Sequence, residues 1–467
     1  MDGAIAIVGM SCRFAGCATP AAFWDTIVSG RSRLDVPGAD AEIPFGSRNL
    51  FDRPYPVRMG RLGDLYSCVP SMQNFPRQVN AGENQDLYFA TQLAFDALAD
   101  ASMRTHSREP ARGTVRIGYA PPFNSSTVNW LQHTAFLDQT MDIIRRFMPN
   151  APEEALEATK ARLKESLPEP NPASFLMGTG YRFASWIARE CSFSGEATVL
   201  DAGMLSGASA LLGAMRDLRD GSADVALAGA VSPPLGRFYL EGLSGEVRFS
   251  TAKTFTPFSD SPEGTIPGEG GAFFVLKRRE DALRARDRIY ALARAVEIGH
   301  NPDGKPAAVL QAAMRRAGVG PEAIGLVEAD GSGIAAMEAR EIEAVRAAWG
   351  EHERGKAPVG IGSVKGNIGH TLRAAAAAGI AKAALALHHR VLPPQIAPEK
   401  AAAALANPKS PAYLLTAPRP WIAGKSPKTR MAAVLAANFD PANPVGDTAR
   451  DGRCAAIILE EEPEVRQ

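Results

Sequence analysis

One short stretch of the sequence places a side chain where a nucleophile could act. In residues 198–212 a β-prone apolar run meets a group of small residues, and an alanine- and leucine-rich helical pattern follows at once. Met204 falls at the predicted corner between strand and helix. Backbone N–H groups at a helix start stabilise anions, and the positive end of the helix dipole lowers the pKa of a thiol held there. The side chain at this corner is a thioether rather than a thiol.

This stretch resembles the nucleophile elbow of the β-ketoacyl synthases, the condensing enzymes of fatty-acid and polyketide assembly. Residues 201–208 read D-A-G-M-L-S-G-A, and the family pattern is approximately D-T-A-C-S-S-S-L. The run A-I-A-I-V-G-M-S-C-R-F at residues 4–14 is also similar to the opening of a multimodular ketosynthase. The resemblance implies that Met204 occupies the position of the nucleophilic cysteine and that Cys12 has a structural role.

A second motif, V-E-A-D-G-S-G-I at residues 327–334, resembles the family's E-A-H-G-T-G-T. The family's histidine hydrogen-bonds the thioester carbonyl oxygen and helps stabilise the enolate that forms when malonyl thioester loses carbon dioxide. Asp330 stands at this position, and an ionised carboxylate only accepts hydrogen bonds and would repel both malonate and enolate. Of the two threonines that contact the pantetheine arm, Ser332 keeps one hydroxyl and Ile334 loses the other.

A third motif is nearly intact. Residues 362–371 read G-S-V-K-G-N-I-G-H-T, and the family reads G-S-V-K-S-N-I-G-H-T. The resemblance implies that His370 is the second histidine on the oxyanion side and that Lys365 is the cation that positions it. Leu372 replaces the glutamate that normally pairs with this lysine, which leaves the charge of Lys365 to another partner. Because this loop is packed into the core in the family's fold, a structural role for both residues stays open.

The last departure lies near the C-terminus. Residues 438–444 read N-F-D-P-A-N-P where the family's gating loop reads F-G-x-G-G-T-N. The resemblance implies that Phe439, together with Ser332, contacts substrate. Glycines in a gate permit backbone movements that bulky residues and proline forbid, so we expect this gate to be stiffened or closed.

Composition sets outer limits. The 467 residues are 45% hydrophobic and include 51 basic and 51 acidic residues, which is typical of a globular chain and gives no net charge to favour nucleic acid. No apolar run approaches the roughly 20 residues of a membrane span, and no signal-peptide pattern opens the sequence, so we expect a cytoplasmic protein. The five cysteines are scattered and are interpreted as free thiols, and no metal or cofactor is expected.

The resemblance also implies the architecture, a thiolase-like α/β fold of two similar α-β-α-β-α halves in five layers. We expect residues 1–285 to form the first half, with a cap insertion at about 121–170, and residues 286–467 to form the second. Periodicity predicts a helix over 85–101, and the N-terminal run predicts a buried strand that breaks at Gly9. The sequence shows no repeat clear enough to prove an internal duplication.

These observations favour a non-condensing ketosynthase homologue that acts as a partner subunit, like the chain-length factors. Each missing electrostatic stabiliser costs on the order of 10²–10³ in rate, and the missing nucleophile removes the covalent route. Met204 is flexible and polarizable and suits the filling of a closed acyl channel. The implied partners are an active ketosynthase in a heterodimer, or a second copy in a homodimer, and an acyl carrier protein with a phosphopantetheine-linked acyl chain.

Two alternatives stay open. One is a malonyl or acyl thioester decarboxylase or hydrolase, in which Asp330 and His370 activate water and Ser206 is recruited as a nucleophile. The sequence lacks the G-x-S-x-G elbow of serine hydrolases, which counts against it. The other is a module that binds acyl carrier protein without influence on acyl length.

Overall fold

The structure of the whole chain is a computed structural model. It describes residues 3–35, 58–63, 85–104, 111–120, 130–167, 169, 180–232, 237–244, 247–300, 306–352, 358–423, 429–438 and 453–463.

Eleven strands of the described residues form one mixed sheet in the order β10-β8-β7-β12-β13-β6-β1-β5-β4-β2-β3. The first half contributes β1 (Ile5–Phe14), β2 (Gly113–Gly118), β3 (Ala197–Leu200), β4 (Val225–Ser232) and β5 (Gly270–Arg278). The second contributes β6 (Ala291–His300), β7 (Ile324–Glu328), β8 (Val359–Gly362), β10 (Ala412–Leu414), β12 (Met431–Ala437) and β13 (Arg453–Glu460). The halves join where β1 pairs antiparallel with β6.

The strand order reveals a duplication that the sequence alone does not show. From its outer edge inward the first half-sheet runs β3, β2, β4, β5, β1, and from its outer edge inward the second runs β8, β7, β12, β13, β6, with β10 added outside. In each half the first three of these strands are parallel and the remaining pairings are antiparallel. The two halves therefore share one topology.

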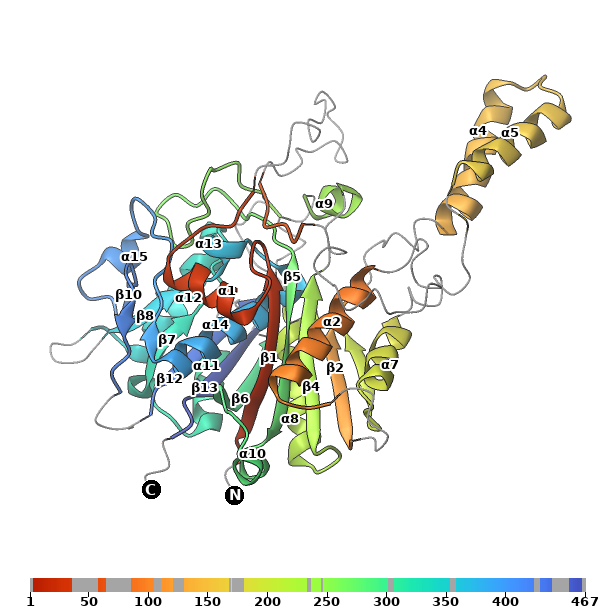
Figure 1. Cartoon of the computed structure of the whole chain (residues 1–467). Coiled ribbons are helices and arrows are strands. Elements are labelled where there is room, and N and C mark those ends of the chain that lie inside the picture. The colour runs from red at the N-terminus through yellow and green to blue at the C-terminus, as the bar shows by residue number, and fades with distance from the viewer. Residues whose placement is uncertain are drawn as a thin grey trace.

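Helices cover both half-sheets. The first half contains α1 (Pro20–Val28), α2 (Gln85–Asp100), α7 (Gly180–Glu190), α8 (Ser206–Arg219), α9 (Arg237–Ser244) and α10 (Arg279–Ala285). The second contains α11 (Ala307–Ala317), α12 (Ala335–Trp349), the short α13 (Lys365–Ile368), α14 (Ala375–His389) and α15 (Ala403–Ala406). Helices α2 and α7 cover the outer face of the first half-sheet, and α11 and α12 cover that of the second (Figure 1).

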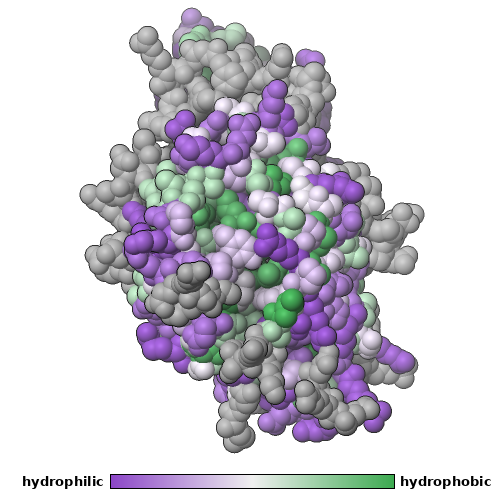
Figure 2. Space-filling model, turned by 90° about the vertical axis from the view of Figure 1, so that its left-hand side faces the viewer, coloured by the Kyte–Doolittle hydropathy of each residue, from purple (hydrophilic) through white to green (hydrophobic). Residues whose placement is uncertain are grey.

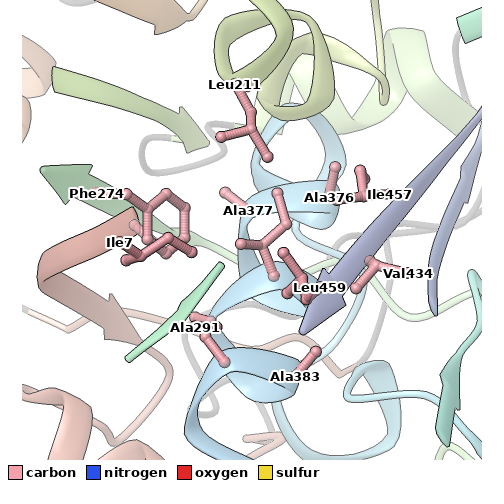
Figure 3. Packing of buried hydrophobic residues seen from close by; sticks show 14 of the residues in the cluster. Ile7, Leu211, Phe274, Ala291, Ala376, Ala377, Ala383, Val434, Ile457 and Leu459 are labelled. Atoms are coloured by element: carbon pink, nitrogen blue, oxygen red, sulfur yellow. The ribbon is translucent and has the colours of Figure 1, made fainter. Parts of the chain in front are cut away.

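Helices α8 and α14 form the middle layer between the two half-sheets. Helix α14 is rich in alanine, the best helix former, and its small side chains let strands approach from both sides. Figure 3 shows Ala376, Ala377 and Ala383 of this helix between Phe274 on one side and Val434 on the other. Five layers result, as the sequence resemblance predicted.

Residues 132–165 form a separate helical hairpin. It consists of a π-helical turn (Gln132–Phe136), α4 (Leu137–Phe147) and α5 (Glu153–Glu165), and it projects from the body (Figure 1). Leu137, Met141 and Leu156 are buried, whereas Phe147 is 84% exposed. The hairpin falls within the predicted cap insertion.

One local prediction is confirmed and another is wrong. The helix predicted over 85–101 is α2, within one residue at its end. The predicted break of the first strand at Gly9 was wrong, because β1 continues to Phe14 and Gly9 only shifts the register against β5. A Cβ on Gly9 would lie 2.5 Å from the Ala97 carbonyl oxygen, so the glycine serves the close approach of α2.

One face of the molecule carries a group of hydrophobic residues. Figure 2 shows the face over β10 and α15, where hydrophobic residues gather near the middle and hydrophilic residues lie around them.

No helix in the described parts of the chain combines the length and apolar character needed to cross a membrane. Cys12, Cys17, Cys191 and Cys454 are buried free thiols, and burial raises their pKa values, while Cys68 lies outside the described residues.

Candidate functional site

Met204 lies in the sharp turn that joins β3 to α8, as the sequence predicted. The turn requires Gly203, whose φ of +62° is a left-handed conformation. A Cβ at Gly203 would also lie 2.8 Å from Asn438 Oδ1. The Gly203 N–H donates to Asp201 Oδ1 at 3.1 Å, which helps hold the turn.

The backbone amide of Met204 already has an acceptor within the chain. Its N–H donates to the side-chain Oδ1 of Asn438 at 2.8 Å, and Asn438 follows the end of β12 and is buried. An elbow N–H is the type of donor that stabilises an oxyanion in acyl transfer. Any anion at this elbow must compete with the Asn438 amide oxygen.

The side chain of Ser206 is committed to the turn itself. Its hydroxyl donates to the Gly203 carbonyl oxygen at 2.7 Å and accepts from the Ala202 N–H at 3.0 Å, and the residue is fully buried. A serine nucleophile needs a base within hydrogen-bond reach of its hydroxyl. The hydroxyl of Ser206 instead uses backbone groups of the turn both as its acceptor and as its donor.

The side chain of Met204 packs against a small apolar cluster, which we name the elbow cluster. The elbow cluster consists of Met59, Leu240, Leu243, Val247 and Leu372, with Met204, Tyr239, Phe249, Ile334 and Met337 packed against it. Three of these positions carry a cysteine, a threonine and a glutamate in the pattern that the sequence resembles: Met204, Ile334 and Leu372. All three residues that differ from the pattern therefore lie in the elbow cluster or pack against it.

Arg373 forms hydrogen bonds that hold the elbow turn against α9. Its guanidinium donates to the Tyr239 hydroxyl of α9 at 2.8 Å and to Asp201 at 3.3 Å. Burial acts to lower the pKa of Arg373, but the negative groups around it raise the pKa on balance. The sequence analysis did not single out this residue.

Asp330 and Lys365 form a buried ion pair. Asp330 follows β7, Lys365 begins α13, and the Lys365 Nζ donates to Asp330 Oδ1 at 2.9 Å and to the Asp330 carbonyl oxygen. Their side chains are only 1% and 5% exposed. Two buried opposite charges in contact compensate much of each other's lost hydration. Leu372 has no charge to pair with Lys365, and the carboxylate of Asp330 takes this role.

His370 faces the other oxygen of this carboxylate. Its Nε2 lies 3.9 Å from Asp330 Oδ2, and its Nδ1 accepts the Leu372 N–H at 3.1 Å. Burial, together with the positive charge of Lys365, holds the pKa of His370 well below its usual value. The imidazole is therefore neutral near pH 7, and because Nδ1 accepts, the proton is assigned to Nε2.

Two glutamates of α12 hold the loop that carries Asp330. Glu341 accepts the N–H groups of Asp330 at 2.6 Å and of Gly331 at 2.8 Å. Glu338 accepts those of Gly333 and Phe258, each at 2.9 Å. The sequence analysis missed both glutamates, although their three-residue spacing places them on one face of a helix directly after the Asp330 motif.

Burial perturbs these acids strongly. It raises the pKa of Glu341 to about 8, and the charge of Asp330 adds to the effect. Burial raises the pKa of Glu338 to about 7. Both carboxyl groups therefore change protonation within the physiological range.

A further buried pair supports the site from the middle layer. Lys382 Nζ of α14 lies 2.5 Å from Glu328 Oε2, and Glu328 Oε1 accepts the Val364 N–H at 2.6 Å. Gln395 accepts the Ser363 N–H and donates to the Pro257 carbonyl oxygen. These contacts fix the loop before Lys365 to the end of β7.

The remaining predicted residues differ in outcome. Ser332 is fully buried, and its Oγ accepts the Ile334 N–H at 3.3 Å. Phe439 and the gating segment 439–444 lie outside the described residues. The structure brings Asp330, His370 and Lys365 into one buried group, and Leu372 links that group to the cluster on which Met204 packs.

Comparison with known proteins places this geometry in a family. The β-ketoacyl synthase N-terminal domain matches residues 2–282, and the β-ketoacyl synthase C-terminal domain matches residues 293–399. A non-reducing polyketide synthase of Macrophomina phaseolina is 29% identical over 445 residues, which cover 90% of this chain and 18% of that protein. One component of the polyunsaturated fatty acid synthase of a Thraustochytrium species is 28% identical over 406 residues, 84% of this chain and 18% of that component. The chain thus spans less than a fifth of the length of either relative.

Solved structures share the fold. The oxazolomycin ketosynthase domain of Streptomyces albus JA3453 superposes with a TM-score of 0.77 at 24% identity, over 99% of this chain and 76% of that one. The ketosynthase from module 6 of the bacillaene synthase of Bacillus subtilis 168 gives a TM-score of 0.74 at 24% identity, over 98% and 72%. The fold is thiolase-like, as the sequence resemblance implied. The chain belongs to the β-ketoacyl synthase family.

Proposed function

We propose that this chain is a non-condensing member of the family that serves polyketide or fatty-acid synthesis as a partner subunit, in the manner of a chain-length factor. The observation that carries the proposal is the elbow itself. Met204 stands at the position of the nucleophile, its N–H is held by Asn438, and its side chain packs on apolar residues. None of these three features supports attack on a thioester.

The second motif supports the same conclusion. Catalysis of decarboxylation at this position requires a hydrogen-bond donor toward developing negative charge. Asp330 offers an acceptor, and Lys365 is already bound to it. Of the two donors in the family's pattern, only the Nε2–H of His370 remains. The framework is preserved while the groups that polarise a thioester are exchanged.

The edge of the first half-sheet offers a surface for a second protein chain. Strand β3 ends the strand order, so one of its sides has no neighbouring strand among the described residues, and its four residues are half-buried. An edge strand presents unpaired N–H and C=O groups that can pair with another chain. Because β3 leads directly into Met204, a partner that binds there lies beside the elbow. The proposed occupant is an active ketosynthase, or a second copy of this chain.

The decisive experiment combines the chain with an active ketosynthase and a loaded acyl carrier protein. We expect the chain to alter the length distribution of the products without forming product alone. As a control, the same mixture is prepared with a variant in which Val199 of the β3 edge is replaced by Lys, which should abolish the effect. An unchanged distribution would refute the chain-length role. Binding of carrier protein with unchanged product length would favour a simple binding module instead.

One observation favours a second candidate function. Asp330 Oδ2 and His370 Nε2 lie 3.9 Å apart and could together hold a water for a thioester decarboxylase or hydrolase. Ser206 does not join such a site, because its hydroxyl is committed to the backbone of the turn. Incubation of the chain alone with malonyl carrier protein separates the candidates. Carbon dioxide or free acid above background would favour the enzyme, whereas the partner subunit predicts neither.

A further inference from the structure

The helical hairpin of residues 132–165 carries most of the large apolar side chains that the described residues expose. Seven such side chains are exposed, and five of them lie on this hairpin: Phe136, Ile143, Phe147, Met148 and Leu163. The hairpin projects from the body (Figure 1), and its own buried residues belong to none of the apolar clusters of the body. An exposed apolar group that the core does not use marks an interaction site.

Four residues of the hairpin form one line along α4, which we name the α4 stripe. The α4 stripe consists of Phe136, Thr140, Ile143 and Phe147, and their spacing of four, three and four residues places them on one side of a helix. The three apolar members are 46%, 53% and 84% exposed, in chain order. The buried Met141 lies on a different side of α4, so the hairpin's own packing leaves the stripe uncovered.

The charges of α4 are ordered along the helix. Asp138 and Asp142 lie in its first half, and Arg145 and Arg146 lie in its last turn. Two copies of α4 packed antiparallel would place the acidic half of each beside the basic half of the other, whereas parallel packing would place like charges together. A contact about a two-fold axis requires a self-complementary surface. The α4 stripe and its charges meet this requirement in the antiparallel arrangement.

Ion pairs orient the two helices of the hairpin toward each other. Lys160 Nζ of α5 lies 2.9 Å from Asp138 Oδ1, and Arg145 Nη2 lies 2.8 Å from Glu153 Oε1. Both pairs join α4 to α5, so the stripe is presented by a preformed pair of helices. Two such pairs that pack through their α4 helices form a four-helix bundle, a common arrangement of amphipathic helices.

We propose that the α4 stripe is a contact between two copies of this chain, whose hairpins pack antiparallel about a two-fold axis. Phe136 of one copy then faces Phe147 of the other, and Thr140 faces Ile143. This contact does not use the edge of β3, so it goes beyond the proposed function. Four side chains per copy make an interface smaller than the roughly 800 Å² per partner of a standard stable one, so we expect a dimer that dissociates in the micromolar range.

Sedimentation velocity of the whole chain, from about 1 to 100 µM, tests the contact. The variant Val199→Lys, in which the β3 edge is blocked, should still form dimers as the concentration rises. Addition of Phe147→Glu to this variant should weaken the dimer at least about 10-fold, because a charge enters an apolar contact. The matched control is Ala158→Glu, which adds the same charge at an exposed site on the side of α5 opposite the buried Leu156 and should change nothing. Monomers at every concentration, or equal effects of the two glutamates, would overturn the inference.

A second pair of variants tests the direction of packing. Gln139 and Arg146 are exposed, lie seven residues apart on the same flank of the stripe, and come side by side between the two copies only when these are antiparallel. Gln139→Glu should therefore strengthen the dimer about 2- to 5-fold, and Gln139→Lys should weaken it by a similar factor. Equal dissociation constants for the two variants would overturn the antiparallel contact. If the hairpin dimer is absent but the chain still alters product length with an active ketosynthase, this inference fails and the proposed function stands.

Discussion

Lys365 Nζ donates to Asp330 Oδ1 at 2.9 Å in a site where both side chains are buried. This pair unites two of the motifs in which the sequence departs from the family's pattern. Asp330 stands where the family's pattern has a histidine, so a hydrogen-bond donor is lost at that position. Its carboxylate supplies a counter-charge for Lys365, because Leu372 stands where the pattern has a glutamate. The two exchanges are thus physically linked through one lysine.

The ion pair predicts a double-mutant cycle. Asp330→Leu alone leaves Lys365 buried without a counter-charge and should cost about 3–5 kcal/mol of unfolding free energy, and Lys365→Met alone should cost a similar amount. The double variant should be more stable than either single one. Urea denaturation measures all four proteins, and Lys160→Met, which breaks an exposed pair with Asp138, should leave the unfolding free energy essentially unchanged. Strictly additive losses would contradict the pairing.

Restoration of the thiol should not restore condensation. Met204→Cys supplies a nucleophile, but the elbow N–H stays bonded to Asn438 and Asp330 still offers no donor. We expect the variant to form no condensed product with acyl and malonyl carrier proteins, as measured by mass spectrometry. Labelling with iodoacetamide shows whether the new thiol is accessible. Product formation by this single change would refute our account of Asp330.

Removal of the Asn438 side chain should loosen the elbow. Asn438→Ala deprives the Met204 N–H of its acceptor, which should cost about 1–3 kcal/mol of unfolding free energy and speed hydrogen exchange at that amide. The matched control is Asn407→Ala, because Asn407 Oδ1 also accepts a backbone N–H but at an exposed site. The control should change stability by less than about 0.5 kcal/mol. Equal effects of the two variants would mean that the Asn438 contact is not formed in solution.

Glu341 predicts a pH dependence of stability. Burial raises its pKa to about 8, so the folded chain binds more protons than the unfolded chain between the ordinary pKa of a glutamate and about 8. The contribution of this group is fully present below pH 4.5 and is lost as pH rises toward 8, by up to about 1.4 kcal/mol per pH unit. Glu341→Gln should flatten the fall in Tm between pH 5 and 8. Glu343→Gln, on the exposed face of the same helix, should leave the slope unchanged.

The family resemblance implied the layers of the fold, and the local strand, small-residue and helix pattern predicted the place of Met204 at a strand-to-helix turn. It did not show the duplication, which lies in strand order rather than in residue identities. It also missed the Asn438 contact to Met204, which joins positions 234 residues apart. Glu338 and Glu341 were missed because a glutamate on a helix is usually solvated, and only the packing of α12 against the Asp330 loop reveals their burial.

We propose that this framework cannot take an acyl group onto itself. Intact-protein mass spectrometry after incubation with octanoyl-pantetheine tests it most directly, with an active ketosynthase under the same conditions as the positive control. We predict that the chain keeps its unmodified mass while the active ketosynthase gains one octanoyl group. A stable octanoyl adduct on this chain, mapped to the elbow around Met204, would contradict the account.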